Sequence, residues 1–294
     1  MQTMTTKEGI HLREMAEQDV PPVLDLINAE GWNYDIGDIV RILTVSPHDS
    51  IVACSGNEVV GAVTATQHSG RALLGHVVVR ADFRRKNIGK KMMKRVLEDF
   101  DRKGMQIVEL YALPDVRPFY SGMGFRKVGD LTIYQGKPRD DVVVEMRNAK
   151  MRSLAAEDLD RVKKLDEAVL GWDRAMIIEV LMLPYLAHSF GVFSQGKLSG
   201  FALGRSGDNS AEVGPWIMDQ PDYDDAKALL VTTMRSLGGR SVYVEVNNDN
   251  LLATKVALDI GLEPMCPVDR MVRSKLDVGN FHKGVMSYAA LEFG

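Results

Sequence analysis

The sequence has few cysteines and no long hydrophobic run. Its 294 residues include only two cysteines, Cys54 and Cys266, which lie far apart and lack the spacing of a metal-binding motif. We therefore expect no metal site and a reduced, cytoplasmic protein. The longest apolar region, 176–187, is interrupted by a glutamate and a proline and is too short to span a membrane. The polar residues 1–9 lack the apolar core of a signal peptide.

The sequence also lacks an excess of positive charge. Its 36 lysines and arginines are outnumbered by 40 acidic residues, which gives a net charge of −4. This balance argues against nucleic acid as a general partner. Basic residues are nevertheless concentrated in one place, because seven of them lie between Arg84 and Arg95 with no acidic residue among them.

Two nucleotide-binding motifs are incomplete. The run Gly122-Met123-Gly124 begins like a dinucleotide fingerprint, but the third glycine is absent and a helix pattern, not a strand, precedes it. The run Gly89-Lys90-Lys91 lacks the hydroxyl side chain with which a P-loop binds magnesium. The sequence therefore predicts neither a Rossmann domain nor a nucleoside triphosphatase.

No Gly-, Ser- or Pro-rich linker divides the chain, although its length suggests two domains. Instead, the chain repeats itself, with residues of the first half recurring roughly 140 positions later. The recurring pairs are Arg13 and Arg152, Asp19 and Asp158, Gly31 and Gly171, Gly56 and Gly196, and Gly124 and Gly261. We predict tandem domains of residues 1–147 and 148–294 that pack together.

The first half alternates between strand and helix patterns. The predicted strands are 10–13, 50–55, 59–67, 72–79, 106–112, 131–135 and 142–147, with the last two closing the sheet of that half. The predicted helices are 17–28, 35–43, 88–100 and 116–123. This order predicts an α+β fold, in which a mostly antiparallel mixed sheet is flanked by helices and has one crossover through the basic helix.

The basic segment begins that helix. Cations normally stabilise the other end of a helix, so a cluster at the start calls for a negative partner. The free N–H groups of a helix start after a strand bind anions well, and a phosphorylated ligand would supply the charge. The alternative is a solvated basic surface on an ordinary helix.

The order of elements and this loop resemble the GNAT superfamily of N-acetyltransferases. The family loop, Arg/Gln-x-x-Gly-x-Gly/Ala, corresponds to Arg84–Gly89, where Asn87 replaces the first glycine. Asparagine adopts left-handed backbone angles more readily than most residues, so the turn can persist. A second signature, Phe-Tyr-x-x-x-Gly-Phe, is intact at 119–125. The resemblance covers 10–147 closely and the second half in topology only.

The resemblance implies that the protein binds acetyl-CoA and transfers the acetyl group directly to a primary amine, without a metal. The diphosphate would lie on the backbone N–H groups of 85–90, and the pantetheine arm would lie along 77–79 like an added strand. The residues expected to bind the coenzyme are Val77, Val78, Val79, Arg84, Arg85, Lys86, Asn87, Ile88, Gly89 and Lys90.

Tyr120 is the candidate general acid. The resemblance places its phenol near the sulfur, where it can protonate the departing thiolate. The alternative is a packed aromatic, which is the role we expect for Phe119. The general base is less defined: Glu109, Asp115 and His76 are candidates, and a water relay would also serve. Of these we select Glu109.

The second half has the same order of elements as the first but lacks the residues to which we assign its chemistry. Where the phosphate loop should recur, 218–226 contains four acidic residues and no basic one, and Ala257 stands in the position of Tyr120. Acidic residues suit a helix start without any ligand, and they would repel a diphosphate. The second half is therefore either a scaffold or a wall of the acceptor pocket.

Together these features predict a two-domain N-acetyltransferase with one active site, in residues 1–147. Its acceptor would be a small-molecule or peptide amine, with neither nucleic acid nor membrane as partner, and a homodimer is possible. The alternative is a non-catalytic CoA-binding sensor or interaction module. Asn87 and the acidic second loop favour that alternative, whereas Tyr120 favours the enzyme.

Overall fold

The computed structural model describes residues 9–146, 149–279 and 283–294. The expectations for 1–8 and for a domain boundary at 147–148 therefore lie outside the described residues. The first half contains β1 (Ile10–Glu14), β2 (Ile51–Ser55), β3 (Glu58–His68), β4 (Arg71–Val79), β5 (Ile107–Ala112) and β6 (Arg126–Gly136), with helices α1 (Val20–Asn28), α2 (Ile36–Val45), α3 (Ile88–Arg102) and α4 (Arg117–Ser121).

The second half repeats this order. Its strands are β7 (Lys150–Ser153), β8 (Ser189–Ser194), β9 (Lys197–Ser206), β10 (Ala211–Met218), β11 (Val242–Asn247), β12 (Glu263–Ser274) and β13 (Val285–Ser287). Its helices are α5 (Leu159–Leu170), α6 (Ala175–Met182), α7 (Tyr223–Ser236) and α8 (Leu251–Asp259). In the described residues, the strands form one sheet in the order β1-β2-β3-β4-β5-β12-β6-β11-β13-β10-β9-β8-β7. Helices flank this mostly antiparallel sheet, which confirms the predicted α+β fold.

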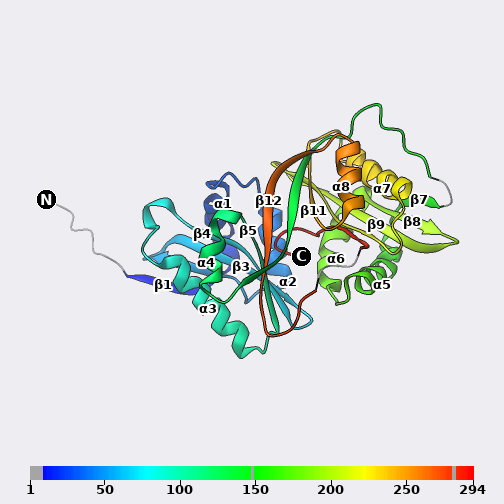
Figure 1. Ribbon diagram of the computed structural model, residues 1–294. Coiled ribbons are helices and arrows are strands. Elements are labelled where there is room, and N and C mark those ends of the chain that lie inside the picture. The colour runs from blue at the N-terminus through cyan, green and yellow to red at the C-terminus, as the bar shows by residue number, and fades with distance from the viewer. Residues whose placement is uncertain (1–8, 147–148, 280–282) are drawn as a thin grey trace.

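The two halves exchange equivalent strands. β6 and β12 each follow the short helix of their own half, α4 and α8, yet each pairs in the other half. β12 lies antiparallel to β5, with Met271 opposite Leu110, and β6 lies antiparallel to β11, with Tyr134 opposite Val244. Figure 1 shows β12, in orange, lying beside β6, in green, between the two lobes. The sheet therefore runs unbroken through both halves.

This exchange corrects the prediction that 131–135 and 142–147 close the sheet of the first half. β6 is occupied by β12 on one side and by β11 on the other, so no edge remains for a following strand. Residues 142–146 form no strand, and Arg147 lies outside the described residues. Val142, Val144 and Met146 instead pack against the apolar core of the second half.

A shared core joins the halves. Ile39 and Ile42 of α2 belong to the same buried cluster as Ile177 and Ile178 of α6. The chain places its C-terminus in the same region, between the two lobes in Figure 1. Burial of apolar surface is the main stabilising contribution to such packing. The two halves therefore pack together, as we expected from a sequence without a flexible linker between them.

The duplication is visible in matching contacts. Arg13 donates two hydrogen bonds to Asp19, at 2.6 and 2.8 Å, and Arg152 donates the equivalent pair to Asp158, at 2.6 and 2.9 Å. Each arginine lies on the first strand of its half and each aspartate precedes the first helix. The repeat read from the sequence is therefore a structural repeat.

The helix bounds differ slightly from those predicted. The predicted helix 17–28 is a 3-10 turn at Glu17–Asp19 followed by α1, whose first turn holds two prolines. The predicted helix 116–123 is reduced to α4. Helix α3 buries the six apolar residues expected on one face, namely Ile88, Met92, Met93, Val96, Leu97 and Phe100. This face fixes the orientation of the helix start.

Candidate active site

β4 and β5 run parallel but pair only at their beginnings. The paired residues run from Arg71 and Ile107 to Leu74 and Leu110, and beyond them the strands part. On its other side β4 has an irregular register with β3, and His76 has a left-handed φ of 35° at that point. Such a bulge bends a strand and redirects its side chains. The parting of the strands leaves room for a ligand.

A cavity of about 500 Å³ fills this opening. Its first-half wall includes both parted strands, Gly75–Val79 and Leu110–Leu113, together with Tyr120. Its second-half wall includes Ser210, Glu212, Tyr243, Glu245 and Glu292. The cavity thus lies between the halves, and both contribute side chains to it.

The backbone of Val77–Val79 borders the cavity at an open strand edge. Val78 and Val79 pair with Ala62 and Gly61 of β3, whereas the pairing with β5 has already ended at Leu74. Open backbone groups of this kind can pair with an extended ligand as an added strand would. One backbone group of this segment already has a partner: the carbonyl of Val79 accepts a hydrogen bond of 2.9 Å from Nε of Arg84.

The basic loop makes a left-handed turn into α3. Arg85 and Asn87 both have φ of 61°, and Asn87 occupies the position before the helix. The amide of Lys91 donates to the carbonyl of Asn87, so the three preceding helical amides have no acceptor one turn earlier in the helix. Asparagine therefore provides the turn that the family loop makes with glycine, and the helix start presents free N–H groups.

Two basic side chains of the loop already have partners on the protein. Arg84 forms an ion pair with Glu30, and Nζ of Lys86 donates to the carbonyl of Asp82 at 2.9 Å. Residues 84–87 are exposed, as is Lys90, whereas the side chain of Ile88 is only 2% exposed. Ile88 can therefore contact a ligand only through its backbone. The exposed charges fit an anion site and also a solvated surface.

Gly89 brings the loop close to the other two motifs. A side chain at this position would contact the ring of Phe119 at 3.7 Å and the side chain of Val79 at 3.8 Å. Phe119 is 38% exposed, so our expectation of a core residue was wrong; its ring packs on the surface against Tyr120, with centroids 5.1 Å apart. The strand, the loop and the Phe-Tyr motif therefore meet at one end of the cavity.

Tyr120 borders the cavity from α4. It is 8% exposed, and burial raises the pKa of its phenol to about 12. The side chain is thus protonated at neutral pH, which is the form that a general acid requires. Tyr120 is packed in the core, as the alternative interpretation predicts, and it also borders the cavity, so its role as the acid stays a prediction.

Glu109 is held away from the cavity by a buried ion pair. Its carboxylate accepts hydrogen bonds from Nε and Nη2 of Arg270, at 2.7 and 3.0 Å, and from the hydroxyl of Tyr111 at 2.8 Å. It does not contribute to the cavity wall, unlike Tyr120. The structure therefore does not bring Glu109 together with Tyr120, and it gives the glutamate a structural partner.

The other two candidate bases are placed differently. Asp115 lies in the exposed turn before α4. His76 borders the cavity, where its Nδ1 lies 2.8 Å from the hydroxyl of Thr64 and its Nε2 has no hydrogen-bond partner. Burial lowers the pKa of His76 to about 3, so the ring is neutral.

The acidic side chains of the second half were missed by reasoning from sequence. Glu212 of β10, Glu245 of β11 and Glu292 near the C-terminus all face the cavity. A signal was present, because Glu212 and Glu245 are the single carboxylates in two mostly apolar strands. What the sequence could not supply is the register that brings them opposite β4.

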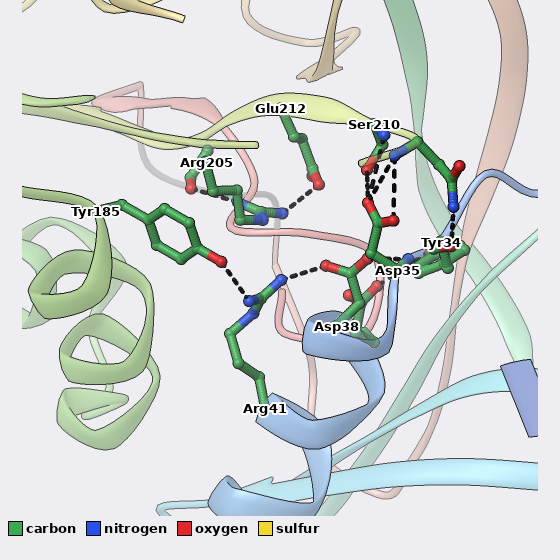
Figure 2. A network of polar contacts seen from close by, with 11 residues as sticks. Tyr34, Asp35, Asp38, Arg41, Tyr185, Arg205, Ser210 and Glu212 are labelled. Atoms are coloured by element: carbon green, nitrogen blue, oxygen red, sulfur yellow. Dashed lines mark hydrogen bonds and ion pairs between the residues drawn. The ribbon is translucent and has the colours of Figure 1, made fainter. Parts of the chain in front are cut away.

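A polar network connects the halves beside these glutamates (Figure 2). Asp35 accepts hydrogen bonds from the backbone and hydroxyl of Ser210, at 3.4 and 3.3 Å. Arg41 reaches across to the hydroxyl of Tyr185 at 2.9 Å and pairs with Asp38 on its own helix. Contacts across this boundary fix the second-half wall of the cavity against α2.

A second ion pair anchors that wall. Arg205 of β9 pairs with Glu212 of the neighbouring strand and donates to the carbonyl of Gly214 at 2.8 Å (Figure 2). Arg205 is only 5% exposed. The charge of Glu212 is therefore matched on the protein.

The equivalent helix start in the second half is closed by its own carboxylate. Asp222 precedes α7 and accepts hydrogen bonds from the amides of Asp224 and Asp225, at 3.0 and 3.3 Å. A carboxylate in this position satisfies the free N–H groups that a phosphate would otherwise bind. Ala257, in the position equivalent to Tyr120, is fully buried.

In 9–146, 149–279 and 283–294, no group of three or more His, Cys, Asp or Glu side chains could hold a metal ion. Within the same ranges, no helix is both long and apolar enough to cross a bilayer.

Comparison with known proteins gives matches in both halves. Residues 39–138 and 162–280 each match a model of the acetyltransferase (GNAT) domain. The chain is also similar to the holothin acyltransferase of Pseudoalteromonas sp. (strain SANK 73390). The two are 22% identical over 269 residues, which cover 90% of this chain and 88% of that protein.

Solved structures share the whole fold. A crystal structure from Pyrococcus horikoshii has a TM-score of 0.77 at 19% identity, covering 98% of both chains. A tandem GNAT protein from the clavulanic acid biosynthesis pathway has a TM-score of 0.66 at 17% identity, covering 92% of this chain and all of that one. At these identities the likeness establishes the fold alone.

Proposed function

The chain belongs to the GNAT superfamily of acyltransferases, with two GNAT domains in tandem, and we propose that it transfers an acetyl group from acetyl-CoA to a primary amine. We place its single active site in the cavity between the halves. In this proposal residues 1–147 form the catalytic domain, and residues 148–294 form the wall that receives the acceptor.

One observation carries this proposal: a single cavity joins the open edge of β4, the phenol of Tyr120 and the carboxylates of the second half. Transfer of an acyl group to an amine needs three neighbouring sites, one for the thioester, one for a proton donor and one for the amine. We infer that the cavity, of about 500 Å³, can hold all three. A binding module would not need the proton donor.

The coenzyme would lie across β4 and the start of α3. The backbone of Val77–Val79 is placed to pair with the pantetheine arm. The amides at the start of α3 are placed to bind the diphosphate, with the left-handed turn at Asn87 directing them outward. Arg84, Arg85, Lys86 and Lys90 would add charge-assisted contacts or attract the coenzyme.

Tyr120 would complete the transfer. As the amine nitrogen bonds to the thioester carbonyl carbon, the C–S bond breaks and the thiolate takes the phenolic proton. The proton that the nitrogen loses then restores the phenol. Burial favours the neutral form of an acid, so the environment that raises the pKa of Tyr120 would also favour the protonated form of the coenzyme thiol as it leaves. Correct placement of the two reacting groups would provide the rest of the acceleration.

The second half would not bind a second coenzyme. Asp222 already occupies the helix start where a diphosphate would lie, and Ala257 offers no proton. We therefore assign it the role of acceptor wall, through Glu212, Glu245 and Glu292.

A non-catalytic CoA sensor is the alternative. Under either function the ion pair between Arg84 and Glu30 must open before Arg84 can bind the coenzyme, so this pair does not separate the two. Calorimetry with acetyl-CoA, followed by thiol release with a panel of amines, separates the two. Turnover with any amine supports the enzyme. Tight coenzyme binding without turnover on the whole panel would support the sensor.

A further inference from the structure

We propose that the acceptor is a compact amine with two cationic centres, which Glu245 and Glu292 bind at the second-half wall of the cavity. This inference rests on the proposed acyl transfer and specifies its substrate class. It gives the second half a chemical task that the first half cannot perform.

Glu245 is a buried acidic residue beside a second carboxyl group. The residue is 6% exposed and borders the cavity. Its Oε2 receives no hydrogen bond from an N–H or O–H donor of the described residues, and its carboxyl lies within hydrogen-bonding reach of the carboxyl of Glu212, with which it can share a proton. A buried carboxylate oxygen without a partner costs free energy unless a cation or a donor reaches it. Since this oxygen belongs to a wall residue, a ligand in the cavity can supply that partner.

Three other acidic residues of the cavity wall already have basic partners. Asp38 is paired with Arg41, Glu212 with Arg205, and Glu30 with Arg84. Those three acidic residues also border the cavity, and each therefore has a basic partner on the protein. For Glu245 and Glu292 the described residues show no such ion pair, so the cavity has an excess of two acidic groups.

Glu292 lies where β4 and β5 part. A Cβ atom built on Gly75 would lie 3.0 Å from Cβ of Glu292, which shows how closely the C-terminal segment approaches β4. The hydroxyl of Thr66 fixes this segment by donating to the carbonyl of Glu292 at 2.9 Å, and Tyr34 donates to its Oε2 at 3.3 Å. The carboxylate is thus held beside the strand that we assign to the thioester.

The burial of Glu292 and Glu245 affects their protonation. Burial, with the nearby carboxylates of Glu212 and Asp38, raises the pKa of Glu292 to about 8 although Arg205 opposes the shift. Burial and Glu212 likewise raise the pKa of Glu245 well above its usual range. A cation in the cavity would favour the ionised form of both groups, so binding of a dication would displace their protons.

The positions of the two glutamates suggest different tasks. Glu292, beside β4, accepts a proton from the nearer ammonium group, and the free amine then attacks the thioester carbonyl. The C–S bond breaks, Tyr120 protonates the thiolate, and the second proton lost by the nitrogen restores the phenol. The balance is one acetamide, one thiol and one released proton. Glu245 binds the second ammonium, which stays charged.

Apolar residues of the cavity wall favour an aliphatic spacer. Apolar side chains of the second half, namely Met265, Val268 and Leu291, border the same cavity. Since the cavity also has to hold the thioester, the acceptor must be small. An α,ω-diaminoalkane has the required two charges and an apolar spacer.

The test compares diamines with monoamines of equal length. Thiol release from acetyl-CoA is measured with 1,4-diaminobutane and 1,5-diaminopentane against butylamine and pentylamine. We expect kcat/KM to be at least about tenfold higher for the diamines, because the second ammonium gains a charge-assisted contact. Equal or higher kcat/KM for the monoamines would contradict the inference.

Variants identify the residues responsible. Glu245→Gln should reduce the ratio of diamine to monoamine kcat/KM to about one, mainly through KM. Glu292→Gln should lower kcat for both amines and remove its pH dependence near 8. Glu263→Gln, on the exposed start of β12, is the matched control and should keep the ratio of the unaltered protein. A ratio unaffected by Glu245→Gln would contradict the assignment.

Failure of this inference is distinguishable from failure of the proposed function. Thermal unfolding of each variant checks that it folds, and calorimetry with acetyl-CoA checks the coenzyme site independently of any amine. Turnover that prefers monoamines contradicts only the dication. Absence of acetyl-CoA binding to the unaltered protein contradicts the acyl transfer itself.

Discussion

The guanidinium of Arg270 on β12 binds the carboxylate of Glu109 on β5 through two hydrogen bonds, 2.7 Å from Nε to Oε1 and 3.0 Å from Nη2 to Oε2. Both residues are only 3% exposed. They belong to different halves, so this pair joins the exchanged strand to the half that receives it. It also engages the carboxylate that the sequence suggested as a base.

Arg270→Ala should therefore be strongly destabilising. It leaves the charge of Glu109 buried without its bidentate partner, and the expected loss is about 3–5 kcal/mol in the free energy of unfolding. Arg273→Ala is the matched control. Arg273 lies on the same strand as Arg270 and forms an ion pair with Asp101, but at a more exposed position. That variant should lose less than about 1 kcal/mol. Urea unfolding measures both, and equal losses would refute the structural role of Glu109.

Tyr120→Phe should slow the chemical step. Removing the proton donor should lower kcat by about 10²- to 10⁴-fold, while the dissociation constant of acetyl-CoA stays within a factor of about two. Tyr134→Phe removes a hydroxyl from a buried tyrosine of β6 outside the cavity and should have little effect on kcat. Steady-state kinetics and calorimetry measure the two quantities. An unchanged kcat in Tyr120→Phe would exclude this residue as the acid.

Reversing two charges in the loop should weaken coenzyme binding. For Arg84→Glu with Lys86→Glu we expect the dissociation constant of acetyl-CoA to rise at least about tenfold, and less so at high salt. The control is Lys94→Glu with Arg102→Glu, the same change in net charge further along α3. Calorimetry at two salt concentrations gives the comparison. If both pairs behave alike, the effect reflects net charge and not a site.

The buried carboxylate of Glu292 should make stability depend on pH. Its pKa is raised from 4.5 to about 8, chiefly by burial, so the folded protein keeps a proton that the unfolded chain has lost. The resulting stability is fully present below pH 4.5 and is lost as the pH rises through 8.

Glu292→Gln should remove this loss, because the amide does not ionise. Its free energy of unfolding should exceed that of the unaltered protein by a margin that grows up to about pH 8, by at most about 1.4 kcal/mol per pH unit. Urea unfolding at pH 6, 7 and 8, without ligand, measures this margin. Parallel pH profiles for the two proteins would mean that Glu292 is not protonated in the folded state.

Much of the fold could be predicted from the sequence because its signals are local. The apolar spacing of α3, the left-handed residue at Asn87 and the repeat of Arg13 and Asp19 all depend on neighbours within a few residues. The family motifs then fixed the order of elements. Local patterns of this kind lead from sequence to element without knowledge of the tertiary structure.

The exchanged strands could not be predicted in this way. β6 and β12 have equivalent neighbours along the chain, so nothing local indicates that each pairs in the other half. The same limit applies to the site, because Glu109 faces Arg270 only through that exchange. Glu292 lies beside Gly75 through a contact between residues far apart in sequence. Pairing between distant strands decides which carboxylate reaches the cavity.

A crystal structure with bound acetyl-CoA tests the central claim most directly. The account predicts the diphosphate on the backbone amides of 85–90 and the thioester between Val77–Val79 and Tyr120, with the second half free of coenzyme. An empty turn at Asn87, or a nucleotide bound at the start of α7, would contradict it.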